Sequence, residues 1–209
     1  MSTDTILVHH SIATPFTACL RRLIESLPVP HRQVISSNSH AKIASLLDSV
    51  TSPSSFSSPA PAATATAAAT ATANLTNRIF KAPKASGSGN LVPVTLIENL
   101  APPGAEKWHA TEAFGPVVAV QAFGAEDEAV DVVRATGCGL SASVFSRDVG
   151  RALALARRLD VGAVHVNGGT VHDEANLPHG GCGLSGYGRF GGPWAIREFT
   201  RTKTIMIYR

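Results

Sequence analysis

Two histidines and two carboxylates lie within eight residues of one another, at His172, Asp173, Glu174 and His179. Imidazoles and carboxylates bind transition metals and exchange protons near neutral pH. Their spacing matches no standard metal motif, so no metal site is predicted here. The favoured interpretation is a polar loop at the rim of a pocket, with His172 and Asp173 kept as candidates for acid–base catalysis.

Three cysteines offer a nucleophilic sulfur, at Cys19, Cys138 and Cys182. Cys19 precedes the apolar Leu20 inside an expected helix, which predicts a small buried hydrophobic residue. Cys182 lies in a glycine-rich segment and is the better candidate for a reactive thiol. An odd number of cysteines without paired spacing excludes a disulfide scaffold and a cysteine-rich zinc site, and it favours a reducing compartment such as the cytoplasm.

Glycines crowd residues 180–192, and Gly186, Gly188 and Gly191 match the spacing of a dinucleotide-binding fingerprint. No expected strand leads into the first glycine, and no acidic residue follows about twenty residues later. A tight loop in which backbone segments pass closely is therefore the favoured interpretation.

The elements that must position these side chains alternate along the chain. Apolar runs predict strands at residues 4–9, 33–36, 92–97, 117–123, 140–145, 161–166 and 205–208. Helical spacing predicts one helix capped by Thr14 with Pro15 in its first turn, and a second capped by Ser39. Further helices are expected at 125–135 and after the capping residue Asp148. Strands that alternate with helices predict an α/β fold with a mainly parallel sheet and flanking helices.

Composition limits the class of protein. The 209 residues are 44% apolar, enough for a sizeable core, and their formal net charge is only +3. No run of Lys or Arg predicts nucleic-acid binding, and no apolar run approaches the roughly 18 residues that span a membrane. The first residues show no secretory signal.

Residues 52–73 consist of Ser, Ala, Thr and Pro with one Phe. Such a stretch buries too little apolar surface to offset its ordering entropy, so a disordered insertion within one domain is expected. An alanine-rich helix is the alternative, which the interleaved Thr and Pro weaken.

Several segments carry a resemblance to a known family. Residues 111–117 read TEAFGPV, residues 139–148 read GLSASVFSRD, and residues 166–192 contain VN, LPHGG and SGYGRFGG. They resemble the EExFGPV, GLSAxVFTRD and VN…PFGGxKxSGxGR segments of the aldehyde dehydrogenase superfamily, in the same order and spacing. The stretches TVHDE at 170–174 and YGRF at 187–190 are most similar to the branch that oxidises aromatic aldehydes such as salicylaldehyde and vanillin.

The resemblance implies that residues 1–209 form the catalytic lobe of such an enzyme, with residues 203–209 as a strand that joins subunits. In the family a cysteine thiolate attacks the aldehyde, hydride passes to NAD or NADP, and a base-activated water releases the acid. By the same resemblance, Glu112 would hold the nicotinamide-ribose hydroxyls and Phe114 would pack near the nicotinamide. Thr170, Val171 and His172 would line the funnel through which the aldehyde reaches the site.

The same resemblance places the nucleophilic cysteine directly before a segment similar to residues 1–6. The general-base glutamate and the nucleotide-binding domain lie further upstream in the family. We therefore expect a truncated family member, impaired or inactive alone and not binding the cofactor by itself.

Two alternatives stay open. The first is an interaction subunit, since a final strand can add to the sheet edge of another copy or of a full-length homologue. The second is a repurposed non-redox enzyme that uses His172, Asp173 or Cys182 for isomerisation, cyclisation or hydrolysis. A small-molecule aldehyde is the expected ligand if the chain is active, with no nucleic acid and no membrane as partner.

Overall fold

The computed structural model describes residues 3–51, 77–82, 89–102, 104–171 and 174–209. The expected insertion at 52–73 lies outside these residues. The chain divides into two compact units, one of residues 3–129 and one that contains residues 130–209. Each unit is described by itself.

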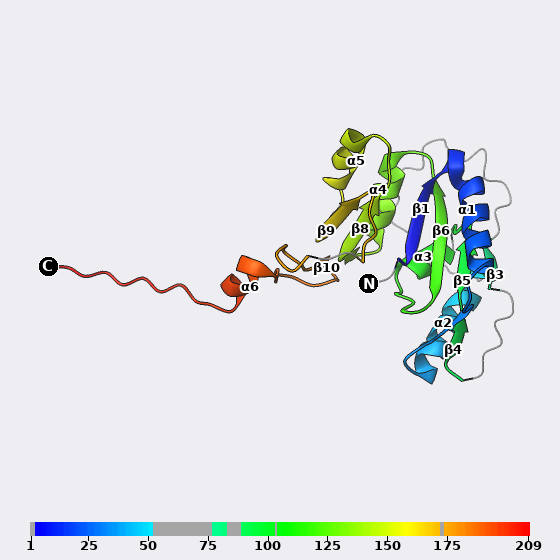
Figure 1. The fold of residues 1–209 in the computed structure, drawn as a ribbon, viewed down its shortest axis with the longest axis horizontal. Helices are drawn as coiled ribbons and strands as arrows, with labels where there is room; N and C mark the ends of the chain where they lie inside the picture. Colours follow the sequence, from blue (N-terminus) through cyan, green and yellow to red (C-terminus); the bar gives the residue numbers. More distant parts are fainter. Residues whose placement is uncertain (1–2, 52–76, 83–88, 103, 172–173) are drawn as a thin grey trace. The chain divides into compact units, whose positions relative to one another are not determined.

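The first unit is built on a four-stranded sheet in the order β1-β6-β5-β3 (Figure 1). Its strands are β1 (Thr5–His9), β6 (Val117–Phe123), β5 (Thr95–Glu98) and β3 (Arg78–Lys81). The first three are parallel, and β3 is antiparallel at the edge. This mainly parallel arrangement, with helices beside it, confirms the predicted α/β class.

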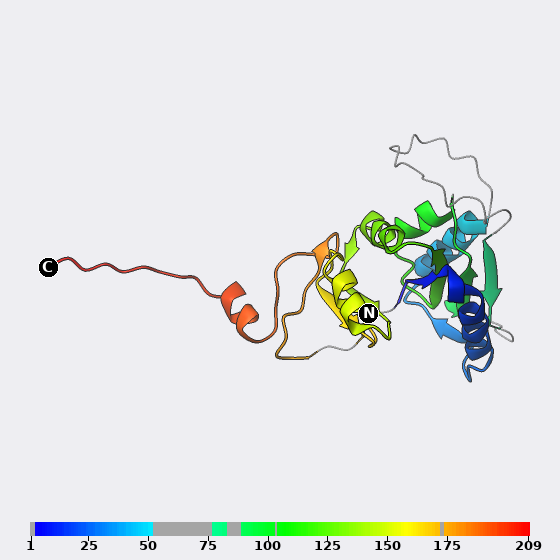
Figure 2. The same cartoon turned by 90° about the horizontal axis from the view of Figure 1, so that it is seen from above.

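Helices cover both faces of this sheet, α1 (His10–Glu25) on one side and α2 (Ser37–Thr51) and α3 (Gly104–His109) on the other (Figure 2). Side chains of neighbouring strand positions point to opposite faces, so Leu96 packs under α1 while Ile97 packs under α2 and α3. Both are fully buried, at 0% exposure. The predicted apolar face of α2 is buried as expected, at Ile43, Leu46, Leu47 and Val50.

An ion pair ties α1 to the sheet. Arg21 donates to both carboxylate oxygens of Glu98 at 2.6–2.9 Å, and its guanidinium lies 4.8 Å from the centre of the Phe80 ring. Glu98 is 4% exposed, so removal of Arg21 would leave a buried charge unpaired.

The second unit has smaller sheets. β8 (Ser141–Val144) pairs in parallel with β9 (Ala163–Val166), and α5 (Val149–Ala156) packs on this pair. β7 (Cys138–Gly139) pairs with β10 (Cys182–Gly183) in antiparallel fashion. α4 (Glu126–Ala135) leads into this unit, and α6 (Gly192–Glu198) follows β10. The predicted cap at Asp148 is confirmed, because its carboxylate accepts the Arg151 N–H.

Several predicted boundaries were wrong. α1 begins at His10, where the His9 ring accepts the Ser11 N–H, and Pro15 lies inside the helix rather than at its start. α2 begins at Ser37, because the hydroxyl of Ser36 accepts the N–H of Ser39.

The strand expected at 92–97 is two strands in different sheets. β4 (Leu91–Pro93) pairs with β2 (His31–Gln33), which begins two residues and ends three residues before the predicted strand at 33–36. The break falls at Val94, whose N–H bonds to the Pro30 carbonyl instead of to the β5 ladder. Residues 200–209 form neither helix nor strand in this single chain, so the pairing of 203–209 between subunits stays a prediction.

Candidate functional site

The two residues predicted to contact a cofactor lie on the loop between α3 and β6, residues 110–116, here called the α3–β6 loop. Glu112 and Phe114 are exposed, whereas Ala113 between them is 2% exposed and belongs to the core. Phe114 adopts a φ of 54°. Left-handed backbone costs a non-glycine residue about 1–3 kcal/mol and persists only where its surroundings hold it. The loop thus presents a carboxylate and an aromatic ring to solvent from a buried anchor.

Two residues of α2, Lys42 and Ile43, contact this loop. The Lys42 ammonium donates to the Glu112 carbonyl oxygen at 2.6 Å. Gly115 lies against Ile43, and a Cβ added at Gly115 would overlap the Ile43 Cδ1 atom. These contacts fix the loop on both sides of Phe114.

Asp4 reaches the same loop from the residue that precedes β1. Its carboxylate accepts the Thr5 hydroxyl at 3.1 Å. Burial raises the pKa of Asp4 above its ordinary value; interactions with the Thr5 hydroxyl and with the Ala113 backbone oppose this shift, and the nearby charge of Glu112 adds to it. Because β1 and β6 are parallel, Asp4 and the α3–β6 loop lie at the same amino edge of the sheet.

A cavity of about 400 Å³ lies in the second unit, within the range of small-molecule sites. It brings together two members of the predicted polar group, Glu174 and His179, with His165 as a further imidazole. The cavity is lined by Leu140, Ser141, Ala163, Val164, His165, Glu174, Leu177, Pro178, His179 and Gly180.

The residues predicted to form the funnel do not line this cavity. Thr170 and Val171 lie outside its walls, and Val171 is 67% exposed. His172 and Asp173, the candidates for acid–base catalysis, lie outside the described residues. Their predicted roles stay predictions.

The start of the predicted funnel segment is anchored to the end of β8. Asn167, with a φ of 57°, accepts the Ser146 N–H and donates to the Ser146 carbonyl, both at 2.9 Å. Ser143 donates to the Gly168 carbonyl at 2.7 Å. These three bonds fix where residues 168–171 leave the strand.

All three cysteines are free thiols. Cys182 is half-buried, and its sulfur lies 3.2 Å from the Nη2 donor of Arg189. Cys19 is exposed, so its predicted burial was wrong: it lies on the face of α1 that turns away from the core beside Leu20. Within the described ranges, no three His, Cys, Asp or Glu side chains lie close enough to hold a metal ion.

The glycine-rich segment forms the tight loop that was predicted. A Cβ added at Gly162 would collide with the Gly180 carbonyl oxygen, and one added at Gly181 would collide with Ser185. Backbone segments therefore pass each other with no room for a side chain. The strand before these glycines, β10, has two residues and pairs antiparallel with β7, unlike the parallel strand that opens a dinucleotide-binding unit.

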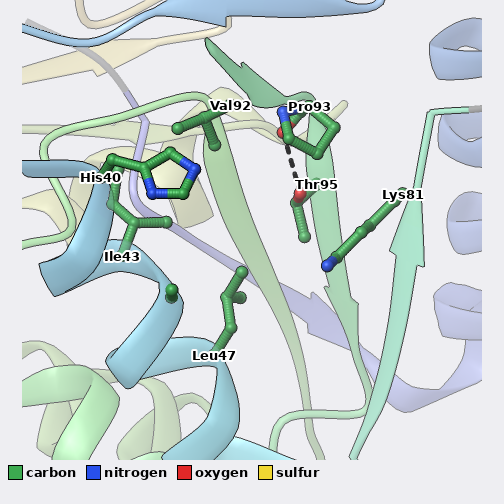
Figure 3. A pocket seen from close by; sticks show the side chains of 8 residues that line it. His40, Ile43, Leu47, Lys81, Val92, Pro93 and Thr95 are labelled. Carbon is green, nitrogen blue, oxygen red and sulfur yellow. Dashed lines mark hydrogen bonds between the residues drawn. The ribbon is translucent and has the colours of Figure 1, made fainter. Parts of the chain in front are cut away.

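A smaller cavity of about 100 Å³ lies beneath α2 in the first unit (Figure 3). Lys81 and His40 are its basic residues, and the Thr95 hydroxyl is already used in donating to the Pro93 carbonyl at 2.9 Å. An engineered cavity that encloses benzene has a volume of about 150 Å³. The hollow is therefore too small for a substituted aromatic ring.

Asp4 and Lys42 are site residues that sequence reasoning missed. The one available signal was a carboxylate placed directly before a buried strand.

No helix in the described part of the chain is both long and apolar enough to cross a membrane.

Comparison with known proteins gives a consistent result. The model of the aldehyde dehydrogenase family matches residues 1–205. A vanillin dehydrogenase of Pseudomonas fluorescens is 41% identical over 119 residues, which are 57% of this chain and 24% of the relative. A benzaldehyde dehydrogenase of Bacillus subtilis is 39% identical over 120 residues, again 57% and 24% of the two chains.

Solved structures agree with the sequence matches. The salicylaldehyde dehydrogenase of Pseudomonas putida G7, complexed with salicylaldehyde, has a TM-score of 0.77 at 27% identity, and the match covers 96% of this chain and 38% of the other. An NADP-dependent glyceraldehyde-3-phosphate dehydrogenase of Bacillus halodurans, complexed with NADP, has a TM-score of 0.77 at 25% identity, with 95% and 38% covered. The chain thus spans about a quarter of the length of the curated relatives it matches.

Proposed function

From the premise that this chain belongs to the aldehyde dehydrogenase family, we propose that it serves the NAD(P)-dependent oxidation of an aromatic aldehyde to the acid. The observation that carries this proposal is the α3–β6 loop, which is held at both ends and exposes Glu112 and Phe114. Relatives named for vanillin, benzaldehyde and salicylaldehyde support the aromatic substrate class.

The exposed side chains fit the ribose and nicotinamide part of the cofactor. The Glu112 carboxylate can accept two hydrogen bonds at once, which suits a pair of ribose hydroxyls. The Phe114 ring offers an apolar face two residues further along, on a backbone already fixed in its left-handed conformation. A bound NAD or NADP would supply the hydride acceptor, and Glu112 and Phe114 would hold it in a pre-formed orientation.

We further propose that the 209 residues do not complete this reaction by themselves. Cys19, Cys138 and Cys182 lie at positions other than the one that the family resemblance gives to the nucleophile. The cofactor contacts proposed for this chain are those of Glu112 with the ribose and Phe114 with the nicotinamide. Its function is then that of a lobe whose chemistry needs further family segments.

An assay of NADH formation at 340 nm tests both statements. The purified 209-residue chain with NAD or NADP and benzaldehyde, salicylaldehyde or vanillin is expected to give no turnover. A fusion with the nucleophile-containing part of a vanillin dehydrogenase is expected to give turnover, and Glu112→Gln in that fusion is expected to raise the KM for the cofactor. Turnover by the unfused chain would contradict the second proposal. A folded fusion that oxidises none of the three aldehydes would contradict the first.

A role as an interaction subunit is the second candidate. It is favoured by the exposed apolar side chains at the end of the chain, at Ile205, Met206, Ile207 and Tyr208, which are 71–86% exposed. The expected partner is another copy of this chain or a full-length homologue. Co-elution of the chain with a full-length relative in size-exclusion chromatography tests this role, and separate elution would exclude it.

A further inference from the structure

We propose that the cavity of about 400 Å³ in the second unit, here called the β8–β9 cavity, binds a neutral aromatic ring that carries a hydroxyl group. Phenol is the simplest such molecule. The residues that line the cavity all belong to the second unit, whereas Glu112 and Phe114 belong to the first. The inference therefore goes beyond the proposed oxidation and does not depend on it.

The size and the wall of the β8–β9 cavity suit a single substituted ring. The hollow that encloses benzene in an engineered protein measures about 150 Å³, so about 400 Å³ leaves room for a ring with substituents. Small-molecule sites combine a mainly apolar wall with a few polar groups that orient the ligand. The apolar part of this wall consists of Leu140, Ala163, Val164, Leu177 and Pro178.

Two polar side chains lie on one side of the cavity. Ser141 pairs with Ala163 in the parallel β8–β9 ladder, and His165 lies two residues beyond Ala163. Paired residues share a face of the sheet, as do residues two apart in a strand, so Ser141 and His165 point to the same side. The Ser141 hydroxyl oxygen is buried and makes no hydrogen bond with any described residue. Buried polar groups nearly always have a partner, so this hydroxyl is one that a ligand can satisfy.

The chemistry of these two side chains and the charge of the wall select the ligand. A phenolic O–H can donate to an imidazole nitrogen while its oxygen accepts a serine O–H. The wall also includes the carboxylate of Glu174, with no Lys or Arg among the described residues that line the cavity. A ligand with a carboxylate would bring a second negative charge beside Glu174, which is unfavourable. A neutral hydroxylated ring avoids this repulsion.

The cavity is pre-formed, because backbone contacts fix its walls. His179 and Phe190 exchange two backbone hydrogen bonds, each at 2.8 Å. A Cβ added at Gly162 would overlap the Gly180 carbonyl oxygen, so the loop at Gly180 lies directly against the chain before β9. A ligand that enters such a site has little ordering of the protein to oppose its binding.

Titration of the full ¹⁵N-labelled chain with phenol, followed by nuclear magnetic resonance, tests the proposal. Phenol is expected to shift the amide signals of Leu140, Ala163 and Leu177 along a saturable curve. Para-hydroxybenzoate has the same ring and hydroxyl with an added negative charge, and it is expected to bind more weakly than phenol. Glu174→Gln should narrow this difference. Absence of saturable shifts at these amides, or equal binding of phenol and para-hydroxybenzoate, would overturn the proposal.

The role of the polar side chains is measured by the ratio of phenol affinity to toluene affinity, since toluene has the same shape without the hydroxyl. Ser141→Ala and His165→Phe are each expected to lower this ratio by up to about tenfold, the factor that one hydrogen bond of ordinary strength gives. Ser143→Ala is the matched control, because the Ser143 hydroxyl already donates to the Gly168 carbonyl at 2.7 Å.

Toluene binding also shows whether the cavity survives in each variant. A variant that binds toluene as the wild type does, with a lowered ratio, supports the proposal. An unchanged ratio in both Ser141→Ala and His165→Phe would overturn it, because the cavity would then accept any apolar ring.

Discussion

At the scale of single residues, Phe114 carries two costs at once: an exposed aromatic ring and a left-handed backbone. Asn167 also has a left-handed backbone, but its side-chain amide makes two hydrogen bonds to the Ser146 backbone that offset the conformational cost. The phenyl ring of Phe114 has no hydrogen-bonding group, so its side chain cannot offset the cost in this way. An unfavourable conformation that exposes a ring is the pattern expected where the ring meets a ligand.

His109, the last residue of α3, gives a prediction about acid sensitivity. Burial lowers its pKa, and the nearby Gln121 opposes this shift in part. Neither His109 Nε2 nor Gln121 Oε1 makes a well-formed hydrogen bond within the described residues, although both atoms are buried. The folded state thus prefers the neutral imidazole.

The sign of the effect follows from linkage. A group with a depressed pKa in the folded state contributes its full stability above the unfolded value of about 6.5 and loses it as pH falls through the folded value. The free energy of unfolding should therefore fall below about pH 6.5, and His109→Gln should reduce that fall. Urea unfolding at a series of pH values from 7.5 to 5 measures this, with the exposed His10→Gln as control. Equal pH dependence in wild type and His109→Gln would contradict the prediction.

At the scale of elements, the sequence predicted what local patterns determine. The apolar run of β6 was predicted at its observed bounds, and β1 within one residue. The predicted start of α1 was wrong: Thr14 and Pro15 form a pattern typical of a helix start, but both lie inside α1. α3 and β3, with six and four residues, have too few positions to show a period. Such short elements are fixed by what they pack against.

The residues of the candidate site also divide into those that a local pattern predicts and those that it does not. Glu112 and Phe114 were found through a motif of adjacent residues. Lys42 contacts that motif across a separation of 70 residues. No local pattern signals a contact that exists only after the sheet and α2 have come together.

The approach of β9 to the glycine-rich loop sets a steric limit that a matched pair of variants tests. A Cβ at Gly162 would meet the carbonyl oxygens of Gly180 and Leu140, which are backbone atoms and cannot turn aside. At Gly168 the nearest atom to such a Cβ is 4.0 Å away. Gly162→Ala should lower the free energy of unfolding by about 1–3 kcal/mol or more, and Gly168→Ala by much less. Equal free energies of unfolding for the two variants in urea would contradict this prediction and show that the glycine-rich loop moves to make room for the added methyl group.

At the scale of the whole molecule, large apolar side chains stay exposed along the last 26 residues. They include Leu184, Tyr187, Phe199 and Ile207, each more than 85% exposed. Apolar surface of this extent usually meets another protein surface. Residues 205–208 form a continuous apolar run, and in an added strand Ile205 and Ile207 would lie on one side.

Removal of residues 203–209 should therefore lower the state of association. The full chain is expected to form an oligomer, and the shortened chain should have a smaller mass by size-exclusion chromatography with light scattering. Ile207→Asp should have the same effect, since a charge on an added strand opposes pairing. Thr202→Asp, just before this segment, is the control. A monomeric full chain, or an oligomer unchanged by the deletion, would contradict the prediction.

The pairing of β1 with β6 also has a consequence for synthesis of the protein. Residues 5–9 pair with residues 119–123, so the first strand must wait for a partner about 110 residues away. At about 5–20 residues per second, translation leaves β1 unpaired for roughly 5–20 s. During that interval Ile6 and Val8 can pack under α1, whereas Leu7 points to the opposite face of the strand. The nascent chain is therefore most exposed to chaperones, and to aggregation, before its sixth strand leaves the ribosome.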